Sequence, residues 1–455
     1  MPLHEWAEKI KKWLVGWKLD PTVVSTLFVL LLAMVALIND PRAVYGAVAA
    51  AIVLSPIWLP VFLAVTFWKM WMHYIRFLHW FKLTPVVLEV TLPAEVTKSP
   101  LAMELALTSL WNTVGESIFI ARIWKGSFRP IFSLEIASNE GRIGFYIHTD
   151  RQWRNTVESR IYGQYPECRI TEVPDYVTEV PFNFDEYTIV GTEYMKNPAH
   201  SQATPIKTYV DYALDKDTDV PETTVEPLSH LLELFSSIGK DQYMWLQIIA
   251  RGRKKDEWYG FYKDGWFKYD SWLEPAKEEI KTIMAGAAKR AQAVLKESEV
   301  VEGKMNALLT DNEKEHIEKI EHSMGKLVFE CGIRSVYIAK KDNVIGPNIV
   351  GLVRLFDPYR TVDLNALNIN NNYGSFNLDF PWQDWGGIRR RKVQENLWFQ
   401  YKNRAYFYVP YDQVPVMLTT EELASLWHFP DSSIKTPGVQ RVESKRAEAP
   451  SGLPI

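Results

Sequence analysis

The residue types that most often bind metals or transfer protons gather in one stretch, residues 311–328, "DNEKEHIEKIEHSMGKLV". His316 and His322 stand there among three acidic residues, Glu315, Glu318 and Glu321. Imidazole nitrogens and carboxylate oxygens are ligands that zinc accepts in proteins. Helices rich in Glu, Lys and His are, however, usually solvated surfaces. We therefore interpret the stretch as an exposed helix and expect no metal site in it.

The motifs of the common enzyme classes do not occur in the sequence. A G-x-x-x-x-G-K-[ST] phosphate cradle is missing, because "SSIGKD" lacks the upstream glycine and the hydroxyl residue after the lysine. H-E-x-x-H, G-x-S-x-G and G-x-G-x-x-G do not occur either. His148 and His428 are interpreted as structural residues. We expect a protein that is not an enzyme and has no catalytic residue, metal or cofactor.

Two apolar runs near the N-terminus predict how the rest of the chain is anchored. Residues 22–38 and residues 43–68 are separated by the short polar break "NDPR". Each run is near the length of about 17 to 25 residues that crosses a bilayer as a helix. Lysines and arginines flank the pair and are scarce between the runs, which places both ends in the cytoplasm. The prediction is a transmembrane helical hairpin in the inner (cytoplasmic) membrane.

The first residues, "MPLHEWAEKIKKWLVGWK", place Trp6, Trp13 and Trp17 at helical spacing, with Lys11 and Lys12 between them. This pattern is typical of an amphipathic helix that lies on a membrane surface. These five residues are candidate membrane-surface contacts. A cytosolic helix packed on the protein's own domain is the alternative.

Composition limits the partners of the cytosolic region. Acidic residues outnumber basic ones after residue 84, so direct nucleic-acid binding is unlikely, since such binding depends on neutralising phosphates. Cys168 and Cys331 lie far apart in the sequence and without a CxxC or Cys/His neighbourhood. We expect reduced structural thiols, because a disulfide is uncommon in the cytosol.

The cytosolic region alternates between strand and helix patterns. Residues 86–180 follow the order β-α-β-β-α-β, with Ser99 and Pro100 opening the first helix and "NEG" joining a hairpin. A similar order returns after residue 187, with "EPLSHLLELFSSI" placed like "SPLAMELALTSL". The fold class predicted is a membrane-anchored α+β protein with two tandem ferredoxin-like (split βαβ) units. The predicted segments are an interfacial helix (1–20), the hairpin (21–84), the first unit (85–180), the second unit (181–415) and a short helix with a linker (416–455).

Two parts of the predicted second α+β unit, residues 181–415, permit more than one interpretation. An Ala-, Lys- and Glu-rich helical insertion covers about residues 272–305, and is either solvated or a contact element of an oligomer. An Asn- and aromatic-rich loop follows at residues 365–387, with the basic run 389–392 beside Trp385, Trp398 and Tyr401. Single-strand nucleic-acid stacking is one interpretation of this run. A solvated or membrane-facing edge is the preferred one.

The closing stretch "LTTEELASLWHFPDSSIKTPGVQRVESKRAEAPSGLPI" contains a short helix that Thr419 or Thr420 caps and that Phe429 and Pro430 end. It resembles the linker that joins the N-terminal domains of membrane-anchored type IV secretion and conjugation ATPases to their P-loop domain. The matching residues are Thr420 to Ala424, Trp427 to Pro430, Thr436-Pro437 and Leu453-Pro454. Residues 227–252 resemble a second segment of that family.

The resemblance implies a non-catalytic inner-membrane scaffold subunit, with a platform for a separate or missing P-loop ATPase. It also implies a homo-oligomer, since such motors form rings. Glu421, Leu423, Leu426, Trp427 and Phe429 would then be candidate partner-docking residues. Without the resemblance, a packed last helix with a disordered tail has similar weight. The alternative function is a membrane-tethered protein- or lipid-binding scaffold unrelated to secretion, which uses the aromatic-rich loops around residues 370–401.

Overall fold

The computed structural model describes residues 40–93, 96, 98–116, 119–215, 226–254, 270–294, 309–370, 384–408, 411–431, 438–439 and 441–442. The chain forms two compact units, Met1–Tyr74 and Ile75–Ile455. The boundary falls inside helix α4, ten residues before the expected end of the hairpin at residue 84.

The first unit contains α3 (Pro41–Val53) and the first part of α4 (Ser55–Phe81). Within the described residues, no single helix is long and apolar enough to cross a bilayer. The pair Val44–Val53 and Ser55–Phe81, bent by 71°, meets that requirement only jointly, by length and composition. The predicted transmembrane hairpin is therefore corrected: the second apolar run divides into two helices. The first run, residues 22–38, and the five candidate membrane-surface residues lie outside the described part of the chain.

The second unit is built on one large sheet. In the described residues, ten strands form it, with the path β12-β1-β3-β2-β6-β7-β5-β8, while β4 pairs with β1 and β11 pairs with β7. All pairings are antiparallel except that of β12 with β1. The strands are β1 (Pro85–Pro93), β2 (Phe132–Asn139), β3 (Arg142–Asp150), β4 (Arg169–Val173), β5 (Tyr187–Lys196), β6 (Gln242–Gly252), β7 (Val328–Lys340), β8 (Leu367–Ile369), β11 (Val416–Thr419) and β12 (Arg441–Val442).

The prediction of two tandem ferredoxin-like units, residues 85–180 and 181–415, is corrected by the pairing of β2 with β6. The order β4-β1-β3-β2 returns in the second half of the sheet as β8-β5-β7-β6. The two sets share an edge, where Ile136 lies opposite Leu246 and Glu135 opposite Gln247. One continuous sheet results, because each set covers the open edge that the other would expose. Strands β6 and β7 are buried over nearly their whole length at its centre.

Helices cover both faces of the sheet. The larger core lies beneath α5 (Pro100–Leu110), α7 (Arg154–Gln164), α9 (Leu228–Ser236), α12 (Gly346–Val353) and α14 (Thr420–Leu426). On the other face, α8 (Tyr176–Glu179) and α13 (Ile388–Lys402) enclose a smaller core that includes Trp245, Leu397 and Tyr401. Shorter elements are α6 (Phe119–Trp124), η1 (Arg151–Trp153), η4 (Lys341–Asn343), η5 (Asp357–Tyr359), η7 (Trp385–Gly387) and the separate pair β9 (Phe407–Tyr408) and β10 (Tyr411–Asp412).

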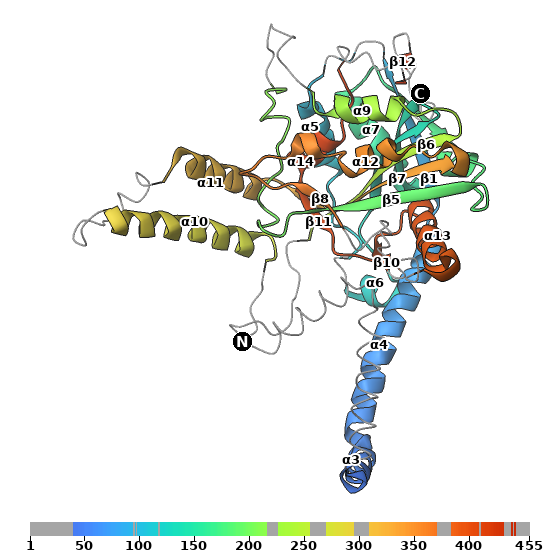
Figure 1. Ribbon diagram of the computed structural model, residues 1–455, viewed down its shortest axis with the longest axis vertical. Helices are drawn as coiled ribbons and strands as arrows, with labels where there is room; N and C mark the ends of the chain where they lie inside the picture. Colours follow the sequence, from blue (N-terminus) through green and yellow to red (C-terminus); the bar gives the residue numbers. More distant parts are fainter. Residues whose placement is uncertain are drawn as a thin grey trace. The chain divides into compact units, whose positions relative to one another are not determined.

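Local sequence signals explain several of these elements. The predicted hairpin is confirmed: β2 and β3 are joined through Glu140 and Gly141, both with positive φ, as the tight hairpin turn requires. Helix α5 begins after Ser99 with Pro100 in its first turn, although the Ser99 side chain makes no capping hydrogen bond. The predicted insertion contains α10 (Leu273–Val294), which lies beside α11 (Asp311–Met324) in Figure 1. An ion pair of 2.5 Å between Arg290 and Glu313 joins these two helices.

Candidate functional site

A cleft of about 500 Å³ opens in the second unit, among segments far apart in the sequence. Its walls come from the end of α4, the segment before β2, the end of β3 and the end of α13. Trp80, Phe81, Phe128 and Trp153 supply aromatic surface. The volume falls within the range of about 300 to 1,000 Å³ that is usual for ligand sites. This cleft is the candidate functional site.

Asp150 fixes one wall of the cleft. The sequence predicts it as the start of a helix, but its side chain makes no cap of the following turn. Its Oδ1 instead accepts a hydrogen bond of 2.8 Å from the backbone N–H of Thr84. The backbone N–H of Arg151 donates to the carbonyl of Thr84 in return. These bonds hold the chain that enters β1 against the end of β3.

Arg404 and Asp175 line the cleft, and Arg404 also pairs with the buried carboxylate of Glu135. The Arg404 guanidinium donates from Nε and Nη2 to the two carboxylate oxygens of Glu135, each at 3.0 Å, and from Nη2 to Asp175 at 2.9 Å. Glu135 also accepts hydrogen bonds from Ser133 at 2.6 Å and Tyr176 at 2.8 Å. A further donor to the same carboxylate is the side-chain amide of Gln247, at 3.0 Å. Both oxygens of this fully buried carboxylate are therefore hydrogen-bonded.

The electrostatics of the pair follow from these contacts. Burial alone would raise the pKa of Glu135, but the charge and hydrogen bonds of Arg404 lower it to about 2. Burial lowers the pKa of His148 on the cleft wall to about 4, and the charge of Arg404 adds to that effect. At neutral pH the carboxylate is ionised and the imidazole is neutral.

The backbone conformation of Arg404 indicates that the contacts of its side chain matter to the fold. Arg404 follows the end of α13 with φ of +50°, the left-handed conformation that helix ends usually give to glycine. A side chain in this region costs some conformational energy, which the surrounding structure must offset. The bonds to Glu135 and Asp175 supply that offset. Glu135 and Asp175 thus hold the Arg404 guanidinium in place. It presents a fixed polar group to a cleft with aromatic walls.

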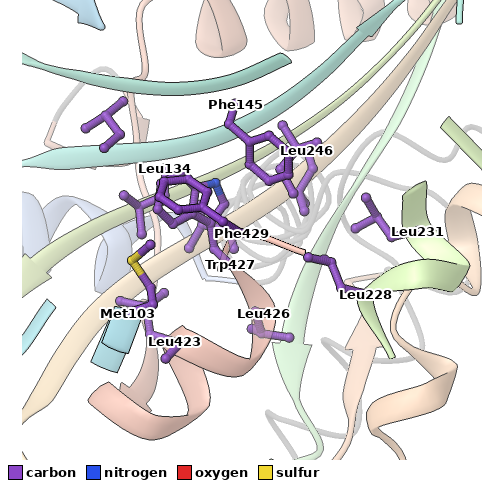
Figure 2. Packing of buried hydrophobic residues seen from close by; sticks show 14 of the residues in the cluster. Met103, Leu134, Phe145, Leu228, Leu231, Leu246, Leu423, Leu426, Trp427 and Phe429 are labelled. Carbon is purple, nitrogen blue, oxygen red and sulfur yellow. The ribbon is translucent and has the colours of Figure 1, made fainter. Parts of the chain in front are cut away.

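The five candidate partner-docking residues lie in the core of the second unit. The predicted helix is present, and of the two caps expected for it, Thr419 is the N-cap, in a capping box with Glu422. Figure 2 shows Leu423, Leu426, Trp427 and Phe429 among Met103, Leu134 and Phe145. Glu421 is also buried, 6% exposed, and binds Thr208, His322 and Lys326.

The docking interpretation is therefore corrected. An amphipathic helix can dock on a partner only through a free apolar face, and α14 has both of its faces inside this chain. Short sequence signals identified the helix but not the sheet that covers it. The alternative interpretation, a packed last helix, agrees with the structure.

The interpretation of residues 389–392 as a nucleic-acid stacking site is also corrected in part. Trp398 stacks on Phe182 with ring centroids 4.1 Å apart, and Tyr401 is fully buried. Arg391 binds Glu395 at 2.8 Å. The rings of Trp398 and Tyr401 therefore pack against residues of this chain and are not available to stack on bases. Most of the preceding loop, residues 371–383, lies outside the described residues.

The histidines separate into different environments. His428 is buried between Glu226 and the carbonyl of Ala424, each at 2.8 Å, as a structural residue would be. His322 binds Glu421 at 2.9 Å. His316 instead meets His200 and Glu279, which the sequence analysis did not single out. These three are the described residues that could hold a metal ion. Because the three residues lie tens of positions apart in the sequence, no short sequence pattern identifies them as a group.

No protein-family model matches the chain, and no curated protein matches it in sequence.

Proposed function

We propose that the protein is a non-catalytic scaffold subunit that associates with a lipid bilayer through α3 and α4 and offers its second unit to a partner protein. The observation that carries this proposal is the exposure of apolar side chains around the two helices of the first unit. Ile57, Phe62, Phe67 and Met70 are each more than half exposed. Others of this kind are Tyr45, Val48, Ile52, Val53, Leu54, Val61, Leu63, Val65 and Tyr74.

The free energy of covering such a surface is large. A Val, Leu, Ile, Phe or Met side chain gains about 1.5 to 3 kcal/mol when it leaves water completely. Exposed apolar patches of this extent mark contacts with membranes or other proteins. A helix that is apolar on all sides needs an apolar surrounding on all sides. Lipid supplies such a surrounding without requiring a matching protein surface, which favours the bilayer over a protein partner here.

The second unit supports the scaffold role. Its buried ion pairs link strands, helices and loops from the whole length of the chain. The Arg404 guanidinium, which lines the cleft, is engaged with the buried carboxylate of Glu135 and with Asp175. The partner class that the closing stretch suggests, a P-loop ATPase, and the homo-oligomeric state stay predictions.

Vesicle flotation tests the proposal. The purified full-length chain, transferred from detergent, is mixed with vesicles of phosphatidylethanolamine and phosphatidylglycerol and separated on a density gradient. We expect the wild type to float with the lipid. The double variant Phe62→Glu/Phe67→Glu should stay largely in the dense fraction, because it places charges on the exposed apolar surface.

The matched control is Val362→Glu/Val414→Glu, which changes two exposed apolar residues of the second unit. This variant should float like the wild type. Equal flotation of the two double variants, or no flotation of the wild type, would contradict membrane association through α3 and α4. Circular dichroism of each variant separates loss of binding from loss of folding.

A further inference from the structure

Three potential metal ligands meet where the helical insertion joins the second unit. His200 comes from the segment after β5, Glu279 from α10 and His316 from α11. The Oε1 atom of Glu279 lies 3.2 Å from Nδ1 of His200 and 3.2 Å from Nε2 of His316. One ligand atom from each residue lies within 4.8 Å of the other two. All three side chains are partly buried.

These separations suit coordination to a small divalent ion. Zinc binds imidazole nitrogen and carboxylate oxygen at about 2.0 to 2.2 Å in a tetrahedron, which places neighbouring ligand atoms roughly 3.3 Å apart. The two distances to Glu279 are close to that spacing, and the third pair, which lies within 4.8 Å, would close toward it when an ion binds. Two histidines and one carboxylate, with a position left open, form a common ligand set of catalytic zinc and of non-haem iron.

Surrounding groups orient the ligands toward a common point. The Nδ1 atom of His316 contacts the backbone carbonyl of Asp363 and so carries the ring proton, which leaves the lone pair of Nε2 facing Glu279. The second oxygen of Glu279, Oε2, accepts hydrogen bonds from the Ser201 N–H at 2.7 Å and the Thr204 hydroxyl at 2.8 Å. Outer contacts of this kind, a carbonyl on the histidine and donors on the carboxylate, accompany metal ligands in proteins.

The lone pairs of His316 Nε2 and of the Glu279 carboxylate face each other and repel unless a positive charge lies between them. A neutral imidazole whose Nε2 lone pair points at a carboxylate oxygen 3.2 Å away is repelled by it. Either a proton on Nε2 or a cation at the centre removes that repulsion. A metal would satisfy both histidines and the carboxylate together, whereas a single proton satisfies one pair.

A cavity adjoins one of the three residues, His316. A cavity of about 270 Å³ beside His316 is lined by Lys207, Asp211, Glu315 and Lys319, together with Asp363. Its charges are mixed, and Lys319 is paired with Asp211 and Glu315 at 3.0 and 2.9 Å. Of the three proposed ligands, His316 lines this cavity, so the site adjoins it through that residue.

We propose that His200, Glu279 and His316 bind one divalent transition-metal ion of the zinc class, with one coordination position left open. The ion would connect α10 and α11 to the segment after β5. A ligand that binds only the folded arrangement stabilises it. The proposal is independent of membrane association, since all three residues belong to the second unit.

Metal titration of the full-length chain tests the proposal. The protein is stripped with a chelator, exchanged into chelator-free buffer and titrated with Zn²⁺ in a calorimeter, with metal content measured by mass spectrometry. We expect one ion per chain and a raised thermal unfolding temperature. His316→Ala and His200→Gln should each weaken binding by at least the factor of about 10 to 100 that loss of an outer-shell partner costs.

Two further variants separate the site from its surroundings. Thr204→Ala removes no proposed ligand, but it removes the hydrogen bonds of this hydroxyl to Glu279 and to the Ser201 hydroxyl, and it should weaken binding by about tenfold. His322→Ala is the matched control, because it removes a histidine of the same helix whose partner is Glu421. It should bind Zn²⁺ like the wild type.

The visible spectrum of bound Co²⁺ gives a readout that does not depend on any variant. Intense absorption typical of four-coordinate Co²⁺ in the wild type supports the site, even where a variant fails to fold. Absence of a bound ion in the wild type, or equal affinity in the folded His316→Ala variant, would overturn the proposal.

Discussion

Glu135 and Glu193 lie in the same sheet, each buried beside an arginine, yet their surroundings differ. Glu135 receives two bonds of 3.0 Å from Arg404 and further bonds from three neighbouring side chains. The closest approach of Glu193 to Arg334 is 3.7 Å, and Tyr411 donates one bond of 2.8 Å. Its second oxygen, Oε2, has no hydrogen-bond partner among the described residues.

The pKa values of the two carboxyl groups are consequently shifted in opposite directions. Burial raises the pKa of Glu193 to about 6, because Arg334 and Tyr411 offset the cost of desolvation only in part. The pKa of Glu135 falls to about 2 despite complete burial, since Arg404 and its hydrogen bonds outweigh that cost. Burial and an adjacent arginine therefore do not decide ionisation alone. The number and geometry of hydrogen bonds to the carboxylate make the difference.

Removal of each arginine should give the largest difference between the two sites. Arg404→Met leaves the Glu135 charge buried without its main partner, and we expect a loss of about 3 to 5 kcal/mol in the free energy of unfolding. Arg334→Met should cost no more than about 1 to 2 kcal/mol, because Arg334 already has nitrogens without hydrogen-bond partners among the described residues. Urea denaturation followed by tryptophan fluorescence measures both values.

Arg391→Met is the control for these variants, since Arg391 forms a largely exposed pair with Glu395. Its effect should stay within about 0.5 kcal/mol. Equal losses for Arg404→Met and Arg334→Met would show that burial, and not hydrogen bonding, determines the cost of breaking either pair.

The pH dependence of stability should show the next largest effect. Glu193 binds its proton more tightly in the folded state, with a pKa near 6, than in the unfolded state, where it is near 4.5. Its contribution is complete below pH 4.5 and is lost as the pH rises to about 6. The loss amounts to about 2 kcal/mol at 1.36 kcal/mol per pKa unit.

The variant Glu193→Gln should not show this loss. Its free energy of unfolding, measured in urea at intervals from pH 4 to pH 7, should change less across that window than that of the wild type. Identical pH profiles for the two proteins would contradict the raised pKa of Glu193. Glu135 acts in the opposite sense, because its contribution is complete above pH 4.5 and is lost as the pH falls toward 2.

The sequence permits correct prediction of what depends on neighbouring residues. The helix at Pro100, the hairpin at Glu140 and Gly141, and the cap at Thr419 are all visible as short patterns. These features arise from backbone preferences and from side chains that bond to the nearest turn. The β-α-β-β-α-β order predicted for residues 86–180 is present as β1, α5, β2, β3, α7 and β4 for the same reason, although the short helix α6 also lies within it.

The sequence does not show which distant edges pair. The contact of β2 with β6 merges the two halves into one sheet, and it depends on strands about one hundred residues apart. Arg404, Asp175 and Glu135 meet only after that sheet has formed. Burial of α14 follows from the same sheet, which explains why its apolar residues resemble a docking surface when the sequence is considered alone. The metal candidate at His200 and Glu279 was missed for the same reason.

The smallest effect should separate the two carboxylates by the loss of one hydroxyl. Tyr411→Phe removes the hydrogen bond that most directly offsets the burial of Glu193 after Arg334, so the pKa of Glu193 should rise further. The pH at which stability stops falling should then move upward. Tyr176→Phe removes one of several donors to Glu135 and should cost only about 1 kcal/mol, without moving the pH window of Glu193. Stability measured against pH for both variants tests this difference. A downward shift in Tyr411→Phe would mean that Arg334 moves to complete the bonds that Glu193 lacks, and that the two sites differ by packing rather than by the number of donors.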